Sequence, residues 1–194
     1  MFTNNFDPVA FNFFAFEIRW YSLSYIFGIL LGWFYCKNFL IKDKNISTLF
    51  DDLITYLIIG IVLGGRIGYI LFYNLKYYFN NLYEIFFIWE GGMSFHGGLI
   101  GIFIATYLFS KKHKINKYVF LDLISISAPI GIFLGRIANF INGELIGKPT
   151  NGNWGVVFTE IDNVPRHPSQ LYECILEGII LFILLNLIFF KKNY

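Results

Sequence analysis

The sequence has 194 residues, of which 56% are hydrophobic and only 14% are charged. Soluble domains average about 25% charged residues, so this composition excludes an ordinary soluble domain and indicates a polytopic membrane protein. A net charge of +2 does not suggest nucleic-acid binding, because the lysines lie in short clusters between apolar runs, where membrane topology explains them.

Five apolar runs have about the length that crosses a bilayer, which is roughly 17–25 residues for a helix. We therefore predict an all-α polytopic membrane protein with five transmembrane helices. Residues 1–14 lack the basic region and the cleavage site of a signal peptide, so we expect them to remain on the mature protein. The predicted helices are residues 20–39, 53–72, 93–109, 118–134 and 170–190.

Lysine clusters follow the first, third and fifth runs, whereas the loops after the second and fourth contain few basic residues. By the positive-inside rule, we expect the N-terminus outside and the C-terminus inside. The polar segment 139–168 then lies outside, where Asn-Gly and Gly residues around 154–158 predict a short hairpin. This segment is too short to fold alone, so we predict a small extracytoplasmic cap on a single membrane domain, residues 1–194.

Polar side chains inside the apolar runs gather at one predicted depth. Each needs a partner where water is scarce, so a functional role is the default interpretation. Asp122 alone lies toward the inner end, and we interpret it as a solvated interfacial group. The agreement between separate runs predicts one cleft that opens toward the outer leaflet. The outer residues are Tyr21, Arg66, His96, Arg136, Glu173 and Glu177.

The stretch GRIANFINGELIG, residues 135–147, contains the densest group of polar residues. If the preceding helix continues through it, Arg136 and Asn139 lie three residues apart on one face. The turn signal Asn142-Gly143 would then fold Glu144 back toward them. The planar guanidinium of Arg136 is suited to bind a phosphate through two hydrogen bonds, so we predict an anion site here.

Two of the outer residues each allow two interpretations. His96, in GGMSFHGGLIG, is either a structural hydrogen bonder or a proton-transfer group, since imidazole titrates near neutral pH. Arg66 either forms a structural ion pair with Glu173 or Glu177, which we favour, or binds a lipid phosphate.

The two cysteines, Cys36 and Cys174, lie inside or beside apolar runs. They suggest neither a disulfide framework nor a metal site. A covalent cysteine nucleophile stays an alternative, but inert buried thiols are much commoner.

Four blocks resemble, in order, the signatures of the bacterial prolipoprotein diacylglyceryl transferases. The resemblance covers almost the whole chain. It implies an enzyme of the bacterial cytoplasmic (inner) membrane that moves the diacylglyceryl group of phosphatidylglycerol onto the lipobox cysteine thiol of a prolipoprotein and releases glycerol phosphate. The lipid, the lipobox peptide and the bilayer are the implied partners, without metal or organic cofactor. The blocks are LGGRIGYILFYN (63–74), EGGMSFHGGLIG (90–101), GRIANFINGELIG (135–147) and RHPSQLYE (166–173).

The resemblance and the required chemistry together give each residue an expected role. Arg136, with Asn139, would clamp the phosphate, and His96 would be the base or its activator. Glu144 would orient the arginine or the asparagine, and Tyr21 would contact headgroup or thiol. The expected catalytic residues are His96, Arg136 and Glu144, and the expected substrate-binding residues are Tyr21, Arg66, Arg136, Asn139 and Asn142.

Two other classes stay open. A membrane transporter should place polar groups along the full membrane depth, whereas the inner halves of these runs are almost purely apolar. A noncatalytic lipid-binding scaffold would explain the glycine-rich packing but not the outer cluster. The resembled family continues for two more membrane helices, one with a further arginine, beyond the end of this sequence. A fragment, a truncated product and a form completed by another chain are the alternatives, and we expect impaired catalysis in the first two.

Overall fold

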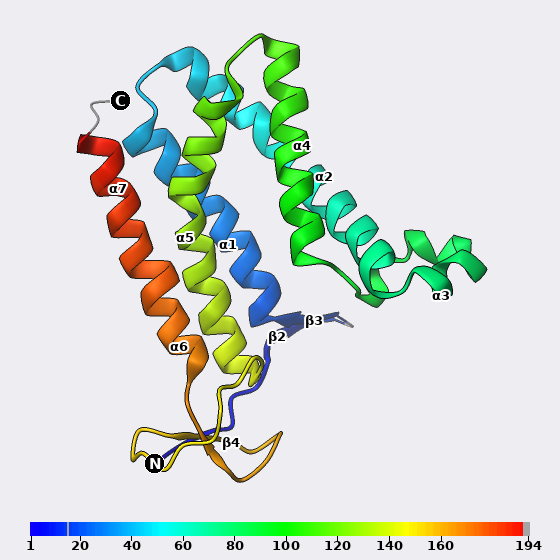
Figure 1. The fold of residues 1–194 in the computed structure, drawn as a ribbon, viewed down its shortest axis with the longest axis vertical. Coiled ribbons are helices and arrows are strands. Elements are labelled where there is room, and N and C mark those ends of the chain that lie inside the picture. Colours follow the sequence, from blue (N-terminus) through cyan, green and yellow to red (C-terminus); the bar gives the residue numbers. More distant parts are fainter. Residues whose placement is uncertain (15, 192–194) are drawn as a thin grey trace. The chain divides into compact units, whose positions relative to one another are not determined.

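The computed structural model describes residues 1–14 and 16–191, and the chain folds into two compact units. Unit 1 consists of Met1–Phe39 and Ile124–Tyr194, and unit 2 of Leu40–Leu123. The described residues are mostly helical, as predicted (Figure 1). Five short strands, all in unit 1, occur among the described residues, whereas beside the helices we expected only one short hairpin.

Four helices among the described residues are long and apolar enough to cross a membrane, which supports a polytopic membrane protein. Four of the five predicted membrane helices therefore meet this description. The third predicted run instead forms α4 (Phe95–His113), a 19-residue helix whose last turn contains Lys111, Lys112 and His113. The four candidate spans are Trp20–Leu40, Lys44–Tyr73, Lys117–Asn142 and Ser169–Lys191.

Two of these helices extend beyond the apolar runs from which they were predicted. Helix α2 (Lys44–Tyr73) begins well before residue 53, because the Asp43 side chain caps it by accepting a hydrogen bond from the backbone N–H of Asn45 at 2.7 Å. Helix α5 (Lys117–Asn142) continues beyond residue 134 through the polar stretch. The polar cap segment that we predicted from residue 139 therefore begins with the last turn of α5 and leaves the helix only after Asn142.

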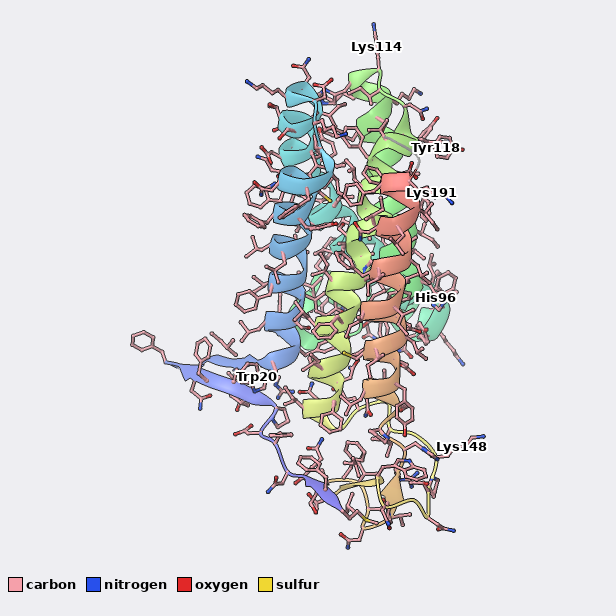
Figure 2. The ribbon with its side chains drawn as sticks, turned by 90° about the vertical axis from the view of Figure 1, so that its left-hand side faces the viewer. Trp20, His96, Lys114, Tyr118, Lys148 and Lys191 are labelled. Carbon is pink, nitrogen blue, oxygen red and sulfur yellow. The ribbon has the colours of Figure 1, made fainter. Side chains whose placement is uncertain are left out.

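In unit 1, helix α1 (Trp20–Tyr35), continued by the π-helical turn Cys36–Leu40, lies beside α5. Gly28 allows this approach, since a Cβ there would lie 3.0 Å from the Cα of Gly131. The last span consists of α6 (Ser169–Glu173), the π-helical segment η4 (Cys174–Ile180) and α7 (Leu181–Lys191). Figure 2 shows Trp20 and Lys148 toward one end of unit 1 and Lys191 toward the other.

The sheet of unit 1 joins the N-terminal strand to the segment between the last two long helices of the chain. Strand β1 (Phe2–Asn4) pairs in parallel with β4 (Val156–Phe158), and β4 pairs antiparallel with β5 (Pro165–Arg166). The β4–β5 pair contains the hairpin that we predicted around residues 154–158. Strand β1 was not predicted, nor was the separate hairpin of β2 (Val9–Phe13) and β3 (Phe16–Arg19).

An ion pair closes the turn between β4 and β5. The Arg166 guanidinium donates to both carboxylate oxygens of Asp162, and these hydrogen bonds, with one from the Val164 backbone, hold the pKa of Asp162 below its ordinary value. A depressed folded pKa means that the stabilisation is present above the unfolded pKa and is lost as pH falls through the folded one.

We therefore expect the β4–β5 turn to open as pH falls below about 4, near the ordinary pKa of aspartate. In Asp162→Asn, the turn should already be open at pH 7, and most of this acid dependence should be lost. Trp154 fluorescence and limited proteolysis measure the opening of the turn. Glu160→Gln is the control, because Glu160 is an exposed carboxylate in the same turn. An unchanged acid response in Asp162→Asn would contradict the assignment.

In unit 2, α2 and α4 lie side by side in direct backbone contact (Figure 1). A Cβ on Gly101 would overlap the carbonyl oxygen of Gly60, and one on Gly64 would overlap that of Gly97. Small residues allow membrane helices to approach in this way. The loop between α2 and α4 contains α3 (Leu75–Asn80) and the 3₁₀ turns Leu82–Phe86 and Ile88–Glu90.

Adding one methyl group at this contact should separate the two helices. We expect Gly101→Ala to destabilise unit 2 by about 1–3 kcal/mol, the usual cost of overpacking, measured as a lower Tm in detergent. Gly98→Ala is the matched control in the same helix, because its Cβ would meet its nearest neighbour at an ordinary 3.8 Å. Equal Tm values for the two variants would contradict this packing.

Candidate functional site

Arg136 lies between two glutamates in unit 1. Its Nη1 is 2.9 Å from Oε2 of Glu173, and its Nη2 is 3.0 Å from Oε2 of Glu177. The guanidinium is on α5, whereas the glutamates are on α6 and η4, so the two ion pairs connect the fourth predicted helix to the fifth. The three side chains are partly exposed, at 26%, 37% and 47% respectively. When all are ionised, the group carries a formal charge of +1 − 2 = −1.

These ion pairs change the expected environment of Arg136. We predicted a guanidinium that faces an anion, and each of its terminal nitrogens instead contacts a carboxylate. Each terminal nitrogen carries two hydrogens, so further donors remain for a third oxygen ligand. The glutamates fix the plane of the guanidinium, but they also compete with an incoming phosphate.

Glu144 folds back onto the end of α5, as the turn signal predicted. Asn139 Nδ2 donates to one carboxylate oxygen at 2.9 Å, and Asn142 Nδ2 donates to the other at 3.3 Å. The Glu144 backbone N–H also donates to the Asn139 carbonyl at 2.9 Å. The turn needs Gly143 at φ = +67°, a conformation that glycine adopts readily, and places Leu145 at φ = +52°. The carboxylate is therefore held by two amides.

Tyr21, at the start of α1, belongs to the same end of unit 1. Its hydroxyl is within electrostatic range of both Glu144 and Arg136, and lies 3.0 Å from the hydroxyl of Tyr25. Five of the predicted site residues are thus in unit 1. Glu144 interacts with Tyr21, Asn139 and Asn142, and Arg136 interacts with Tyr21. We call Tyr21, Arg136, Asn139, Asn142 and Glu144 the unit 1 cluster.

Arg66 does not form the ion pair that we favoured. Arg66 is only 4% exposed. Its guanidinium donates to backbone carbonyls of the loop between α2 and α4 and lies 5.1 Å from the centroid of the Tyr78 ring. The predicted partners, Glu173 and Glu177, bind Arg136 instead. The prediction failed because carbonyl oxygens can satisfy a buried guanidinium as carboxylates do. The acceptors are Glu84 at 2.6 Å, Ile85 at 3.0 Å, Gly91 at 2.6 Å and Gly92 at 3.3 Å.

His96 is the second residue of α4, in unit 2, and is exposed (Figure 2). Its ring centroid lies 5.8 Å from that of Phe95. Ser94 caps this helix by accepting a hydrogen bond from the Gly97 N–H, and its own N–H donates to the Gly65 carbonyl at 2.9 Å. The start of α4 is therefore attached to α2, which fixes the backbone that carries the exposed imidazole.

Sequence reasoning missed two side chains that bind the backbone of the turn at Glu144 and Leu145. The Ser169 hydroxyl donates to the Leu145 carbonyl at 2.7 Å, and the buried Gln170 amide donates to the Glu144 carbonyl. Both belong to the block RHPSQLYE, which we used only as one of the four blocks of the family resemblance. In the described part of the chain, no three His, Cys, Asp or Glu side chains are grouped as a metal site requires.

Comparisons with known proteins found a matching family profile and several similar enzymes. The sequence profile of the family described as prolipoprotein diacylglyceryl transferase matches residues 8–194. The phosphatidylglycerol–prolipoprotein diacylglyceryl transferase of Rickettsia canadensis is 51% identical over 97% of this chain and 74% of the relative. The enzymes of the same name from Rickettsia felis and Rickettsia typhi are 51% and 53% identical over the same shares. The chain therefore belongs to the prolipoprotein diacylglyceryl transferase family.

Proposed function

We propose that the chain transfers the diacylglyceryl group of phosphatidylglycerol to the lipobox cysteine of a prolipoprotein and releases glycerol phosphate. The observation that carries this proposal is the identity of about half the residues with transferases of that name over 97% of the chain. The unit 1 cluster supports it, because it places a guanidinium, two amides and a phenol at the end of apolar helices, where a lipid headgroup could bind.

The reaction forms one bond and breaks one. The cysteine sulfur attacks the glyceryl carbon that carries the phosphate ester, the thioether C–S bond forms, and the C–O bond breaks with its electron pair leaving on the phosphate. The thiol proton goes to a base. A free thiol has a pKa of about 8.5 and is mostly protonated at neutral pH, so a base accelerates the attack.

Arg136 is assigned to the phosphate. Charge grows on the leaving phosphate as the C–O bond breaks, so a guanidinium held against it stabilises the transition state more than the substrate. Glu173 and Glu177 orient the guanidinium, and its remaining N–H groups face the phosphate. Because the glutamates make the local charge negative, binding relies on directed hydrogen bonds more than on net charge.

The other predicted residues are given roles consistent with their contacts. Glu144 orients Asn139 and Asn142, whose amides it already binds, so that one can turn to the phosphate. Tyr21 contacts the headgroup or thiol, and His96 accepts the thiol proton. For Arg66 we replace lipid binding by a structural role, since its guanidinium is buried among carbonyls.

The topology completes the proposal. We assign α4 as a fifth membrane helix, both units to one inner-membrane domain, and the segment 143–168 to an extracytoplasmic cap, with the N-terminus outside and the C-terminus inside. Lysines at the ends of α4 and α7 support this orientation through the positive-inside rule. In cells, an impermeant thiol reagent should label a cysteine at Asn151 and not one at Lys114, and the reverse pattern would overturn the outer-leaflet site.

Mass spectrometry of a lipobox peptide tests the function. Purified protein, or the completed chain if the sequence is a fragment, should add one diacylglyceryl group from phosphatidylglycerol to the peptide. A peptide with serine in place of cysteine should stay unmodified, because a hydroxyl is a far weaker nucleophile. Solute flux in liposomes without peptide modification would favour a transporter. Lipid binding with neither solute flux nor peptide modification would favour a noncatalytic scaffold.

A further inference from the structure

Two consecutive side chains at the start of α6 bind two consecutive carbonyls of the Glu144 turn. Ser169 Oγ donates to the Leu145 carbonyl, and Gln170 Nε2 donates to the Glu144 carbonyl. Both acceptors belong to the part of the turn where Leu145 has a positive φ. The first turn of α6 therefore holds a backbone conformation that the local sequence does not favour by itself.

The burial of Gln170 is not explained by its own hydrogen bonding. The residue is 0% exposed, and its Oε1 has no hydrogen-bond partner within the described chain. A buried amide with an unpaired oxygen stabilises a fold less than an apolar side chain of the same size would. What the amide does supply is one donor directed at the Glu144 carbonyl.

The same helical span also positions Arg136. One turn after Gln170, Glu173 binds the Arg136 guanidinium, and Glu177 follows in η4. The span thus holds the backbone of Glu144 at its first turn and the guanidinium at its next turns. Any shift of this span relative to the end of α5 moves both groups together.

We propose that Gln170, assisted by Ser169, is a positioning residue that holds the Glu144 carboxylate against Asn139 and Asn142 and keeps it in register with Arg136. This inference rests on the proposed function only in assigning Glu144 to the reaction site. The alternative is a purely structural amide that contributes to folding and leaves the turn unaffected when it is replaced.

The variant Gln170→Met distinguishes the positioning role from the purely structural one. Methionine is unbranched and of similar length but lacks a donor, and it also removes the unpaired Oε1, which offsets the lost hydrogen bond in the free energy of folding. We expect an unchanged Tm, faster amide hydrogen exchange in the peptide covering residues 141–148, and a fall in kcat of about 10- to 100-fold from the displaced carboxylate, with little change in the peptide KM. Ser169→Ala should show the same pattern more weakly.

The controls are a neighbouring variant and a double mutant. Tyr172→Phe removes a hydrogen bond from the same helix to His167, without touching the Glu144 turn, and should leave exchange at 141–148 unchanged. Adding Gln170→Met to Glu144→Gln should cost no further activity, because both act through one carboxylate.

Wild-type kcat in Gln170→Met, a loss of kcat with wild-type exchange at 141–148, or additive losses in the double mutant would each overturn the inference. If the wild-type protein modifies no peptide, the proposed function fails. The exchange measurement then still decides the positioning role, since faster exchange in Gln170→Met supports it and unchanged exchange contradicts it.

Discussion

Replacing Arg136 with lysine is expected to lower kcat/KM by about 2–4 kcal/mol of transition-state stabilisation, as the loss of an oxyanion donor does. The structure gives the reason in its two ion pairs. A planar guanidinium can contact Glu173, Glu177 and a phosphate oxygen at the same time, because its donors point in different directions within one plane. A lysine ammonium keeps the charge, but as a compact point charge it cannot hold all three.

Steady-state transfer rates with a lipobox peptide measure this effect. Arg19→Lys is the matched control, since Arg19 forms an exposed pair with Glu17 at 3.4 Å and should lose nothing measurable. The Arg136→Lys defect should persist at every pH, because the loss concerns the leaving phosphate. A variant with wild-type kcat/KM would remove Arg136 from the transition state and leave it as the ion-pair centre between α5 and α6.

Replacing His96 with glutamine is expected to lower activity by about 100-fold at neutral pH, the usual contribution of a general base. Glutamine keeps hydrogen-bonding capacity on the same exposed position at the start of α4, so the change removes proton transfer with little effect on folding. As pH rises toward the thiol pKa of about 8.5, the peptide ionises without assistance, and the variant should partly recover.

The comparison of pH profiles separates the two residues. His96→Gln should approach the wild-type rate between about pH 7 and 9, whereas Arg136→Lys should stay parallel to it. His113→Gln, at the opposite end of the same helix, is the control and should retain full activity. A fully active His96→Gln enzyme would return this histidine to a structural role. Identical pH profiles for the two variants would contradict the separate roles assigned to His96 and Arg136.

Much of the local structure could be predicted from the sequence, because its causes are local. Apolar runs predicted where the long helices lie, and Asn142-Gly143 predicted the turn that brings Glu144 back to Asn139. Helix ends were less predictable. Helix α5 continues to Asn142 because its polar side chains find partners, which hydropathy alone does not register.

Pairings between distant segments could not be predicted. Strand β1 pairs with β4, which lies far along the sequence, and no local pattern indicates a partner at that distance. The exchange of arginine partners has the same origin. The carboxylates of Glu173 and Glu177 required a cation, but the sequence contained two candidate arginines, and only the fold shows that loop carbonyls satisfy Arg66 while Arg136 takes the glutamates.

The ratio of the two products in one reaction tests the central claim most directly. Phosphatidylglycerol labelled in both its diacylglyceryl and its glycerol phosphate parts, incubated with the protein and a lipobox peptide, should give one released glycerol phosphate for each thioether formed. Neither product should appear with the serine peptide. Glycerol phosphate released without thioether would indicate lipid hydrolysis, and this result, or the absence of both products with the cysteine peptide, would contradict a diacylglyceryl transferase.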